Sequence, residues 1–340
     1  RGREISCIVS AARGDPDPCP QTPDHWSIPP LQSSPESVHP AEGNAQDKQT
    51  GTKHREPAVI LSFHPFFHGH IFRLCAGRAP NAQDRRLMRQ ASAILLPPGR
   101  LPSLFVDAVN HCGQVFPNYA PRYAHPGKVG DIRLFRTLNL PHPRTHLFDR
   151  VADCPPGYWQ GLEYPLVLKH NVGGEGRMVH LVHSPEQARE ILNRFARMES
   201  SGMSGFLVQE QVITGQRTLR VVVMHRQVES YWRVQADSDQ FAHNLAQGGS
   251  VDLESDSDLQ EQGRGLVHRL CRLSGIDLAG VDVLFDHARS PQPRPLLLEV
   301  NYFFAVNGLG GLDAYHRKLK SAVGEWLSEH GLSLPKQDDP

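Results

Sequence analysis

The 340-residue sequence lacks an excess of charge of either sign, because 36 Lys and Arg side chains balance 36 Asp and Glu side chains. A balanced chain has no overall field to attract nucleic acid or an anionic membrane, so neither is expected as a partner. It also lacks an apolar run approaching the ~20 residues of a membrane helix. Its first residues lack the basic and apolar pattern of a secretion signal. We therefore expect a cytoplasmic protein whose phosphate contacts, if any, are local.

Several catalytic and binding motifs are also missing. The six cysteines are scattered from Cys7 to Cys271 without a CxxC pair, which favours reduced thiols over a disulfide framework. Neither the P-loop pattern GxxxxGK[ST] nor the dinucleotide pattern GxGxxG occurs. No GxSxG motif or Cys-His pair marks a side-chain nucleophile. A nucleotide site would therefore belong to a different architecture.

The chain divides into four segments by composition and pattern. Residues 1–56 are dense in Pro, Ser, Gln and Asp without apolar periodicity, which predicts a disordered tail. Alternating strand and helix patterns over 57–125 predict a small parallel α/β domain. Two further α/β lobes are predicted over 126–205 and 206–334, so the fold class is α/β (α+β).

Individual elements follow from turn and cap signals. Ser184, with Pro185 and Gln187 behind it, predicts a helix start with a capping box. Buried helix faces are predicted to include Leu104, Val106, Ala108 and Val109 in one helix, and Leu259, Leu266, Val267, Leu270 and Leu273 in another. Strands are expected at 58–63, 92–99, 114–118, 165–170, 178–183, 205–213, twice within 218–235, at 279–286 and at 295–302. Helices are expected near 84–91, 101–113, 131–140, 256–274 and 313–330.

Acidic and amide side chains interrupt two apolar strands near the C-terminus. Glu299 and Asn301 are two residues apart in PLLLEVNY, so both point to the same side of a sheet. Asp282 lies in AGVDVLFD, which we expect to pair with that strand. Three oxygen ligands without Cys or His suit Mg²⁺ or Mn²⁺. The alternative is an acidic strand end in solvent.

Basic residues and glycines predict contacts with phosphate. Lys169 ends an apolar strand directly before NVGGEG, and backbone N–H groups of such a turn can approach phosphate oxygens. A tight hairpin with a surface lysine explains this pattern equally well. Arg220 and Arg233 lie on neighbouring strands and could clamp phosphate or carboxylate oxygens, although each alone could be a structural ion pair.

Three histidines crowd the stretch HPFFHGH at positions 64, 68 and 70. No Cys or fourth ligand has a suitable spacing for a metal site. We therefore interpret them as part of a loop of the substrate lobe or as surface histidines.

These motifs, in their order and spacing, resemble the ATP-grasp superfamily, and within it the RimK-like carboxylate-amine ligases. The resemblance runs from Lys128 with LNLPHPRT through VLKHNVGGEG, LVQEQV, LRVVV, YWRV, FAHNLAQGG and AGVDVLFD to LLLEVN. It implies two α/β lobes that clasp ATP, preceded by the 57–125 domain. Thr218 departs from the pattern, since relatives often carry an acidic residue there.

The resemblance also assigns residues to roles. It implies contacts from Lys128 and Lys169 to ATP phosphates, with Gly173, Gly174 and Gly176 in the covering loop. Glu210, Gln211 and Val212 would line the adenine and ribose pocket. Asp282, Glu299 and Asn301 would hold Mg²⁺ or Mn²⁺. Arg220, Arg233 and Asn244 would meet the γ-phosphate and an acyl phosphate.

The implied function is an ADP-forming ligase that joins a small-molecule or peptide carboxylate to an amine through an acyl phosphate. Two alternatives stay open, a small-molecule kinase of the same fold and a non-catalytic ATP-binding regulatory protein. The apparently complete Asp-Glu-Asn set and the two arginines favour catalysis over binding alone. The sequence is compatible with a homodimer and does not fix the oligomeric state.

Overall fold

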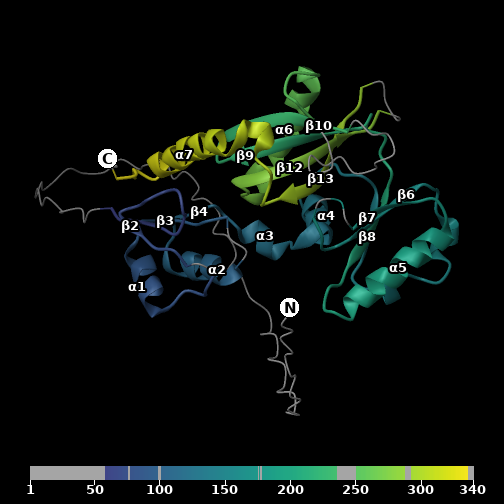
Figure 1. Ribbon diagram of the computed structural model, residues 1–340, viewed down its shortest axis with the longest axis horizontal. Helices are drawn as coiled ribbons and strands as arrows, with labels where there is room; N and C mark the ends of the chain where they lie inside the picture. The colour runs from purple at the N-terminus through teal and green to yellow at the C-terminus, as the bar shows by residue number, and fades with distance from the viewer. Residues whose placement is uncertain are drawn as a thin grey trace, which may run out of the picture. The chain divides into compact units, whose positions relative to one another are not determined.

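The computed structural model describes residues 58–75, 77–98, 101–174, 176, 178–235, 250–287 and 292–335. The predicted tail and Asn244 lie outside these residues. Within them the chain is a mixture of helices and strands in three sheets (Figure 1), so the predicted α/β class is confirmed.

The first sheet is parallel and lies between residues 60 and 116. Its strands β1 (Ile60–Ser62), β2 (Ile71–Phe72), β3 (Ala93–Leu95) and β4 (Val115–Phe116) run in the order β2-β1-β3-β4. All three pairings are parallel, as the sequence predicts for this segment, although β2 was not expected. The helices α1 (Ala82–Gln90) and α2 (Pro102–His111) lie together beside this sheet (Figure 1), and their apolar sides join its core.

The second sheet is antiparallel and has the order β5-β8-β6-β7. Its strands are β5 (Thr145–Phe148), β6 (Leu166–His170), β7 (Val179–Val182) and β8 (Phe206–Glu210), and α5 (Pro185–Glu199) packs against one face. The boundary predicted between residues 205 and 206 would separate β8 from this sheet. Because β8 pairs with both β5 and β6, we place the boundary after Glu210.

The third sheet is antiparallel, with the order β11-β10-β9-β12-β13. Its strands are β9 (Arg217–Met224), β10 (Gln227–Val234), β11 (Ser250–Asp252), β12 (Leu278–Phe285) and β13 (Pro295–Asn301). Helix α6 (Ser257–Ser274) covers one face with an apolar core, while α7 (Gly311–Glu329) packs over part of the other. The predicted hairpin of β12 and β13 is confirmed.

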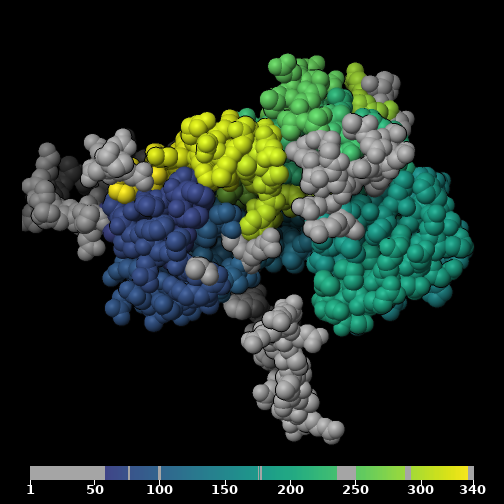
Figure 2. Space-filling view, viewed as in Figure 1, coloured from purple at the N-terminus to yellow at the C-terminus, as the bar shows by residue number. Residues whose placement is uncertain are grey.

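Helix α7 also connects the third sheet to the first. Trp326 on α7 lies against Phe116 of β4, with 5.5 Å between the ring centroids. Phe67 joins the same apolar cluster. Figure 2 shows α7, in yellow, lying directly against the purple segment that contains β1 to β3. The parallel sheet therefore shares a core with the face of the third sheet that α7 covers.

The remaining helices and two strands were not fully expected. Helix α4 (Gly127–Thr137) begins four residues before the predicted start, and the short helix α3 (Ala120–Ala124) and the strands β5 and β11 were not expected. Among the described residues, the 3₁₀ turns are Val151–Asp153, Tyr158–Gly161 and Asn307–Leu309. Among the described helices, none is both long enough and apolar enough to cross a bilayer.

Three local predictions were wrong in detail. Val109 is 37% exposed and Leu273 is 45% exposed, so neither belongs to the buried stripe of its helix, whereas Phe105 is buried. Ser184 caps α5 by accepting from the N–H of Gln187, as predicted. The side chain of Gln187, however, accepts from the N–H of His183 instead of closing a capping box.

Candidate functional site

A row of charged side chains crosses one face of the third sheet. Arg220 on β9 lies directly opposite Asp282 on β12, which lies opposite Glu299 on β13. Residues that face each other across a ladder point to the same side, so the three side chains share a face. Arg233 on β10 reaches the same carboxylate from the next strand.

A bulge in β13 changes the direction in which the side chains before and after it point. Val283 pairs with Leu297, while Asp282 pairs with Glu299, so Leu298 is an extra residue in β13. An extra residue reverses the side-chain alternation at that point. Leu297 therefore points into the core, although it is only two residues before Glu299.

Asp282 is the centre of the charged row and is 1% exposed. Its Oδ1 accepts from Nε of Arg220 at 2.5 Å, and its Oδ2 lies 2.8 Å from a guanidinium nitrogen of Arg233. Burial opposes ionisation of this carboxyl, but the two guanidinium groups outweigh it and hold the pKa of Asp282 below its ordinary value. The predicted alternative of an acidic strand end in solvent is therefore wrong for Asp282.

Asn301 brings the two carboxylates together. Its Nδ2 donates to Asp282 Oδ2 at 3.3 Å and to Glu299 Oε1 at 3.2 Å. The predicted convergence of Asp282, Glu299 and Asn301 is therefore present in the structure. Within the described residues, no three His, Cys, Asp or Glu side chains are grouped so that they could hold a metal ion, and Asn301 presents its amide nitrogen to the two carboxylates.

Arg233 has an unused donor at this site. Its side chain is 13% exposed, and its Nε is buried without a hydrogen-bond acceptor among the described residues. A buried guanidinium N–H without a partner is costly. It is a donor that an anionic ligand could satisfy, which fits the predicted contact with phosphate.

Lys169 faces the charged row from the second sheet. It is 7% exposed, and its Nζ donates to Gln209 Oε1 at 2.7 Å. Gln209 in turn donates from Nε2 to Thr145 Oγ1 at 2.9 Å. Burial lowers the pKa of Lys169 to about 8, with Glu299 acting in the opposite direction. The alternative of a surface lysine is wrong.

The sequence reasoning missed Gln209 and Thr145, which orient Lys169. Gln209 is 3% exposed and lies on the same sheet face as Lys169, diagonally across β6 and β8. A polar side chain in the middle of the apolar strand FLVQE was the available signal. An amide at such a position needs a partner, because an unsatisfied buried polar group is costly.

Lys128 and the glycine-rich turn lie together. Lys128 Nζ donates to the carbonyl of Gly173 at 2.5 Å. Gly173 has a φ of 120° and Gly176 a φ of 71°, values that favour glycine, while Gly174 is exposed. The structure therefore places Lys128 against the turn that was predicted to cover phosphate.

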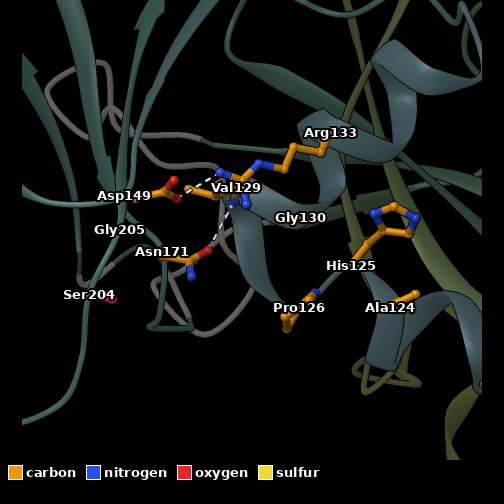
Figure 3. A pocket seen from close by; sticks show the side chains of 10 residues that line it. All are labelled: Ala124, His125, Pro126, Val129, Gly130, Arg133, Asp149, Asn171, Ser204 and Gly205. Atoms are coloured by element: carbon orange, nitrogen blue, oxygen red, sulfur yellow. Dashed lines mark hydrogen bonds and ion pairs between the residues drawn. The ribbon is translucent and has the colours of Figure 1, made fainter. Parts of the chain in front are cut away.

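The start of α4 is fixed to the same turn. Val129 N–H donates to Asn171 Oδ1 at 3.0 Å, and Lys128 N–H donates to the carbonyl of Asn171 at 3.3 Å. Figure 3 shows Asn171 beside Val129 in a small hollow of about 120 Å³, which also holds the ion pair between Arg133 and Asp149. None of the predicted site residues lines this hollow.

Glu210, Gln211 and Val212 mark the end of β8 and the chain that leaves it. The carboxylate of Glu210 accepts from both the backbone N–H and Nε of Arg144, each at 2.8 Å. All three residues are partly buried. Their contact with adenine and ribose stays a prediction.

Asp131 on α4 is a buried carboxyl that the sequence reasoning missed. It is 7% exposed, and its Oδ2 accepts from the N–H of Val300 at 3.1 Å. Burial raises the pKa of Asp131 well above its ordinary value, against the effect of this hydrogen bond. The available signal was an acidic residue three and four positions before the apolar Leu134 and Phe135, on the buried face of the helix.

The histidine-rich stretch is not a metal site in the described residues. His64 is 5% exposed and stacks on Phe67, with 4.4 Å between the ring centroids. Burial lowers the pKa of His64 to about 4, with a smaller effect of His316. The interpretation as surface histidines is therefore wrong for His64. Asn244 lies outside the described residues, and Thr218 is buried in β9.

Comparison with known proteins connects this geometry to a family. The model of the RimK-like ATP-grasp domain matches residues 143–317, slightly more than half of the chain. A relative from Hahella chejuensis, named probable alpha-L-glutamate ligase 2, is 29% identical over 175 residues, 51% of this chain and 53% of that protein. The matched segment thus spans about half the length of this curated relative.

Two crystal structures share the fold. A RimK-domain ATP-grasp protein from Sphaerobacter thermophilus superposes with a TM-score of 0.50 and 17% identity, over 78% of this chain and 97% of that chain. The D-alanine–D-alanine ligase of Bacillus anthracis gives a TM-score of 0.52 and 13% identity, over 76% and 85% of the two chains. At such identities the likeness shows the fold. Together with the family match, it shows that this chain belongs to the RimK-like ATP-grasp family.

Proposed function

We propose that this protein is an ADP-forming ligase that joins a carboxylate to an amine through an acyl phosphate. The observation that supports it best is the buried set of Arg220, Asp282 and Arg233, in which Nε of Arg233 has no acceptor among the described residues. A phosphoryl group carries several oxygens that can accept from such donors. The family and the placement of Lys169 and Lys128 support ATP as the source of that group.

The reaction takes two steps. A carboxylate oxygen of the first substrate attacks the γ-phosphorus of ATP, the bond to the β-phosphate oxygen breaks, and ADP leaves. The amine nitrogen then attacks the acyl carbon, the bond to the phosphate oxygen breaks, and the nitrogen loses a proton. No side-chain nucleophile takes part, so positioning and charge must supply the rate.

The residues on both sides of the site suit the first step. Lys169 and Lys128 would neutralise phosphate oxygens, and the glycines of the turn would bring backbone N–H groups close to them. Arg220 and Arg233 would stabilise the charge that moves during phosphoryl transfer. We place Asn244 with these arginines on the basis of its motif alone, since it lies outside the described residues.

The donor set also fits a divalent cation. Asp282, Glu299 and Asn301 would hold Mg²⁺ or Mn²⁺, because all three supply oxygen, which such cations prefer. When bound, the cation supplies positive charge that offsets the phosphate oxygens. Without it, the guanidinium groups and the amide of Asn301 balance the two carboxylates.

The substrates are proposed by class. The relative named probable alpha-L-glutamate ligase 2 suggests an amino acid or a peptide as carboxylate or amine.

The four free thiols at Cys75, Cys112, Cys154 and Cys271 support a reducing compartment such as the cytoplasm.

The test is to incubate the purified chain with ATP, Mg²⁺, hydroxylamine and a mixture of amino acids and short peptides. Mass spectrometry should detect an ATP-dependent hydroxamate, because hydroxylamine intercepts an acyl phosphate. A Glu299→Gln variant should lower its yield at least about 100-fold, whereas the exposed control Glu254→Gln should not. A phosphate ester without hydroxamate would replace the ligase by a kinase. ATP binding without either product across this panel would support a binding protein.

A further inference from the structure

Strand β13 carries two of the proposed metal ligands, yet it is an edge strand. The sheet order ends in β12-β13, so among the described strands β13 pairs with β12 alone. Every second N–H of an edge strand points away from its partner and needs another acceptor. Val300, between Glu299 and Asn301, has such an N–H, and its acceptor is the carboxylate of Asp131 at 3.1 Å.

Asp131 is well placed to hold this strand. It belongs to α4, whose residues Ile132 and Phe135 are buried in the same apolar cluster as Leu297 of β13. Its side chain is 7% exposed, so water competes little for the hydrogen bond. The edge of β13 is therefore held by a helix that is itself packed in place.

The same helix reaches the other half of the site. Three residues before Asp131, Lys128 donates from Nζ to the carbonyl of Gly173. The N–H groups of Lys128 and Val129 both donate to Asn171, where the glycine-rich turn begins. One short helix thus connects the turn over the proposed phosphate site to the strand that carries Glu299 and Asn301.

We propose that Asp131 is a positioning residue, which fixes the backbone of β13 between Glu299 and Asn301 so that both side chains reach one divalent cation. This inference rests on the proposed function, because it takes Glu299 and Asn301 as metal ligands. Asp131 acts through Val300 and contacts neither the cation nor the reacting atoms. Partners of metal ligands can change metal affinity as strongly as some ligands do.

The test compares Asp131→Ala with Asp131→Asn in the full chain. Alanine removes the acceptor of the Val300 N–H, while asparagine keeps an oxygen in nearly the same place without the charge. Mn²⁺ binding is measured by electron paramagnetic resonance with a non-hydrolysable ATP analogue. Asp131→Ala should raise the Mn²⁺ dissociation constant about 10- to 100-fold, and Asp131→Asn about threefold or less. Arg133→Ala, on the same helix, is the matched control and should leave it unchanged.

A second readout follows the strand itself. Hydrogen exchange in the peptide covering 295–303 should become faster in Asp131→Ala and stay near wild type in Asp131→Asn. Equal Mn²⁺ affinity in wild type and Asp131→Ala would overturn the positioning role, and so would equal weakening in both variants. If wild-type protein binds the ATP analogue but no Mn²⁺, this would instead overturn the proposed metal site. If Asp131→Ala does not fold, the Mn²⁺ dissociation constants of Asp131→Asn and wild type still decide. An increase above tenfold in Asp131→Asn contradicts the proposal.

Discussion

The two faces of the third sheet are built from the same strands but differ in their contents. One face carries Leu219, Val221, Trp232 and Val283, which pack with α6 into an apolar core. On the other, Arg220, Arg233, Asp282 and Glu299 meet, while α7 covers the part nearest Val222 and Met224. Adjacent residues of one strand, such as Leu219 and Arg220, thus belong to opposite environments.

This difference separates stability from function within single strands. Burial of apolar side chains stabilises the fold in proportion to the area removed from water. Buried charges are expensive even when paired, and an apolar replacement of the whole set is often neutral or stabilising. A charged row that is retained in a sheet with an otherwise apolar interior therefore indicates a role beyond folding.

The largest effect should come from removing the shared carboxylate. Asp282→Asn leaves Arg220 and Arg233 buried with less negative charge, and breaking such an arrangement costs about 3–5 kcal/mol. Chemical denaturation without added metal should show this loss of unfolding free energy. The control is Asp149→Asn, whose exposed pair with Arg133 should contribute about 1 kcal/mol or less. Similar small losses of unfolding free energy in both variants would mean that the stability of the charged face does not depend on Asp282.

On the apolar face, Leu219→Ala should lower the unfolding free energy by about 2–5 kcal/mol, because the side chain is fully buried and leaves a cavity. Nucleotide affinity of the folded protein should change by about threefold or less. The exposed Leu253, at 61%, provides the control Leu253→Ala, which should stay within about 0.5 kcal/mol of wild type. A large loss of nucleotide affinity with little loss of stability would contradict the assignment of stability to the apolar face and of ligand binding to the charged face.

A smaller effect is expected from pH. The pKa of Lys169 is about 8, so its charged form dominates below this pH and disappears as the pH rises. Affinity for a non-hydrolysable ATP analogue, measured by calorimetry with Mg²⁺, should fall about tenfold between pH 7 and 9. Lys169→Arg keeps its charge over this range and should flatten the profile. An equally steep fall in the arginine variant would assign the titration to another group.

Local signals predicted most of the fold. Ser184 and Gly275, for example, mark the start of α5 and the end of α6, because caps are decided by neighbouring residues. Strand β5 was missed because THLF is short and follows two prolines, which resembles a loop. Leu273 was misassigned because a periodic pattern shows the direction of a side chain but not where the neighbouring sheet ends.

The arrangement of the candidate site residues was predictable where they are close along the chain or on paired strands. Glu299 and Asn301 point together because the strand period is two, and Asp282 joins them through a hairpin. Asp131 could not be assigned to Val300 from the sequence, because 169 positions separate them. Likewise, the partner of Lys169 depends on how β6 and β8 align, which no local pattern determines.

The bulge in β13 has a consequence for insertions and deletions. The pairs on both sides of it, Val283 with Leu297 and Asp282 with Glu299, already include every partner that a regular ladder needs. Loss of the codon for Leu298 would therefore shorten the strand without changing any pairing partner, and both acidic side chains would still face each other. Loss of Val300 instead would turn Asn301 to the opposite face. At this edge we therefore expect the fold to accept the deletion of Leu298 but not the deletion of Val300, two codons away.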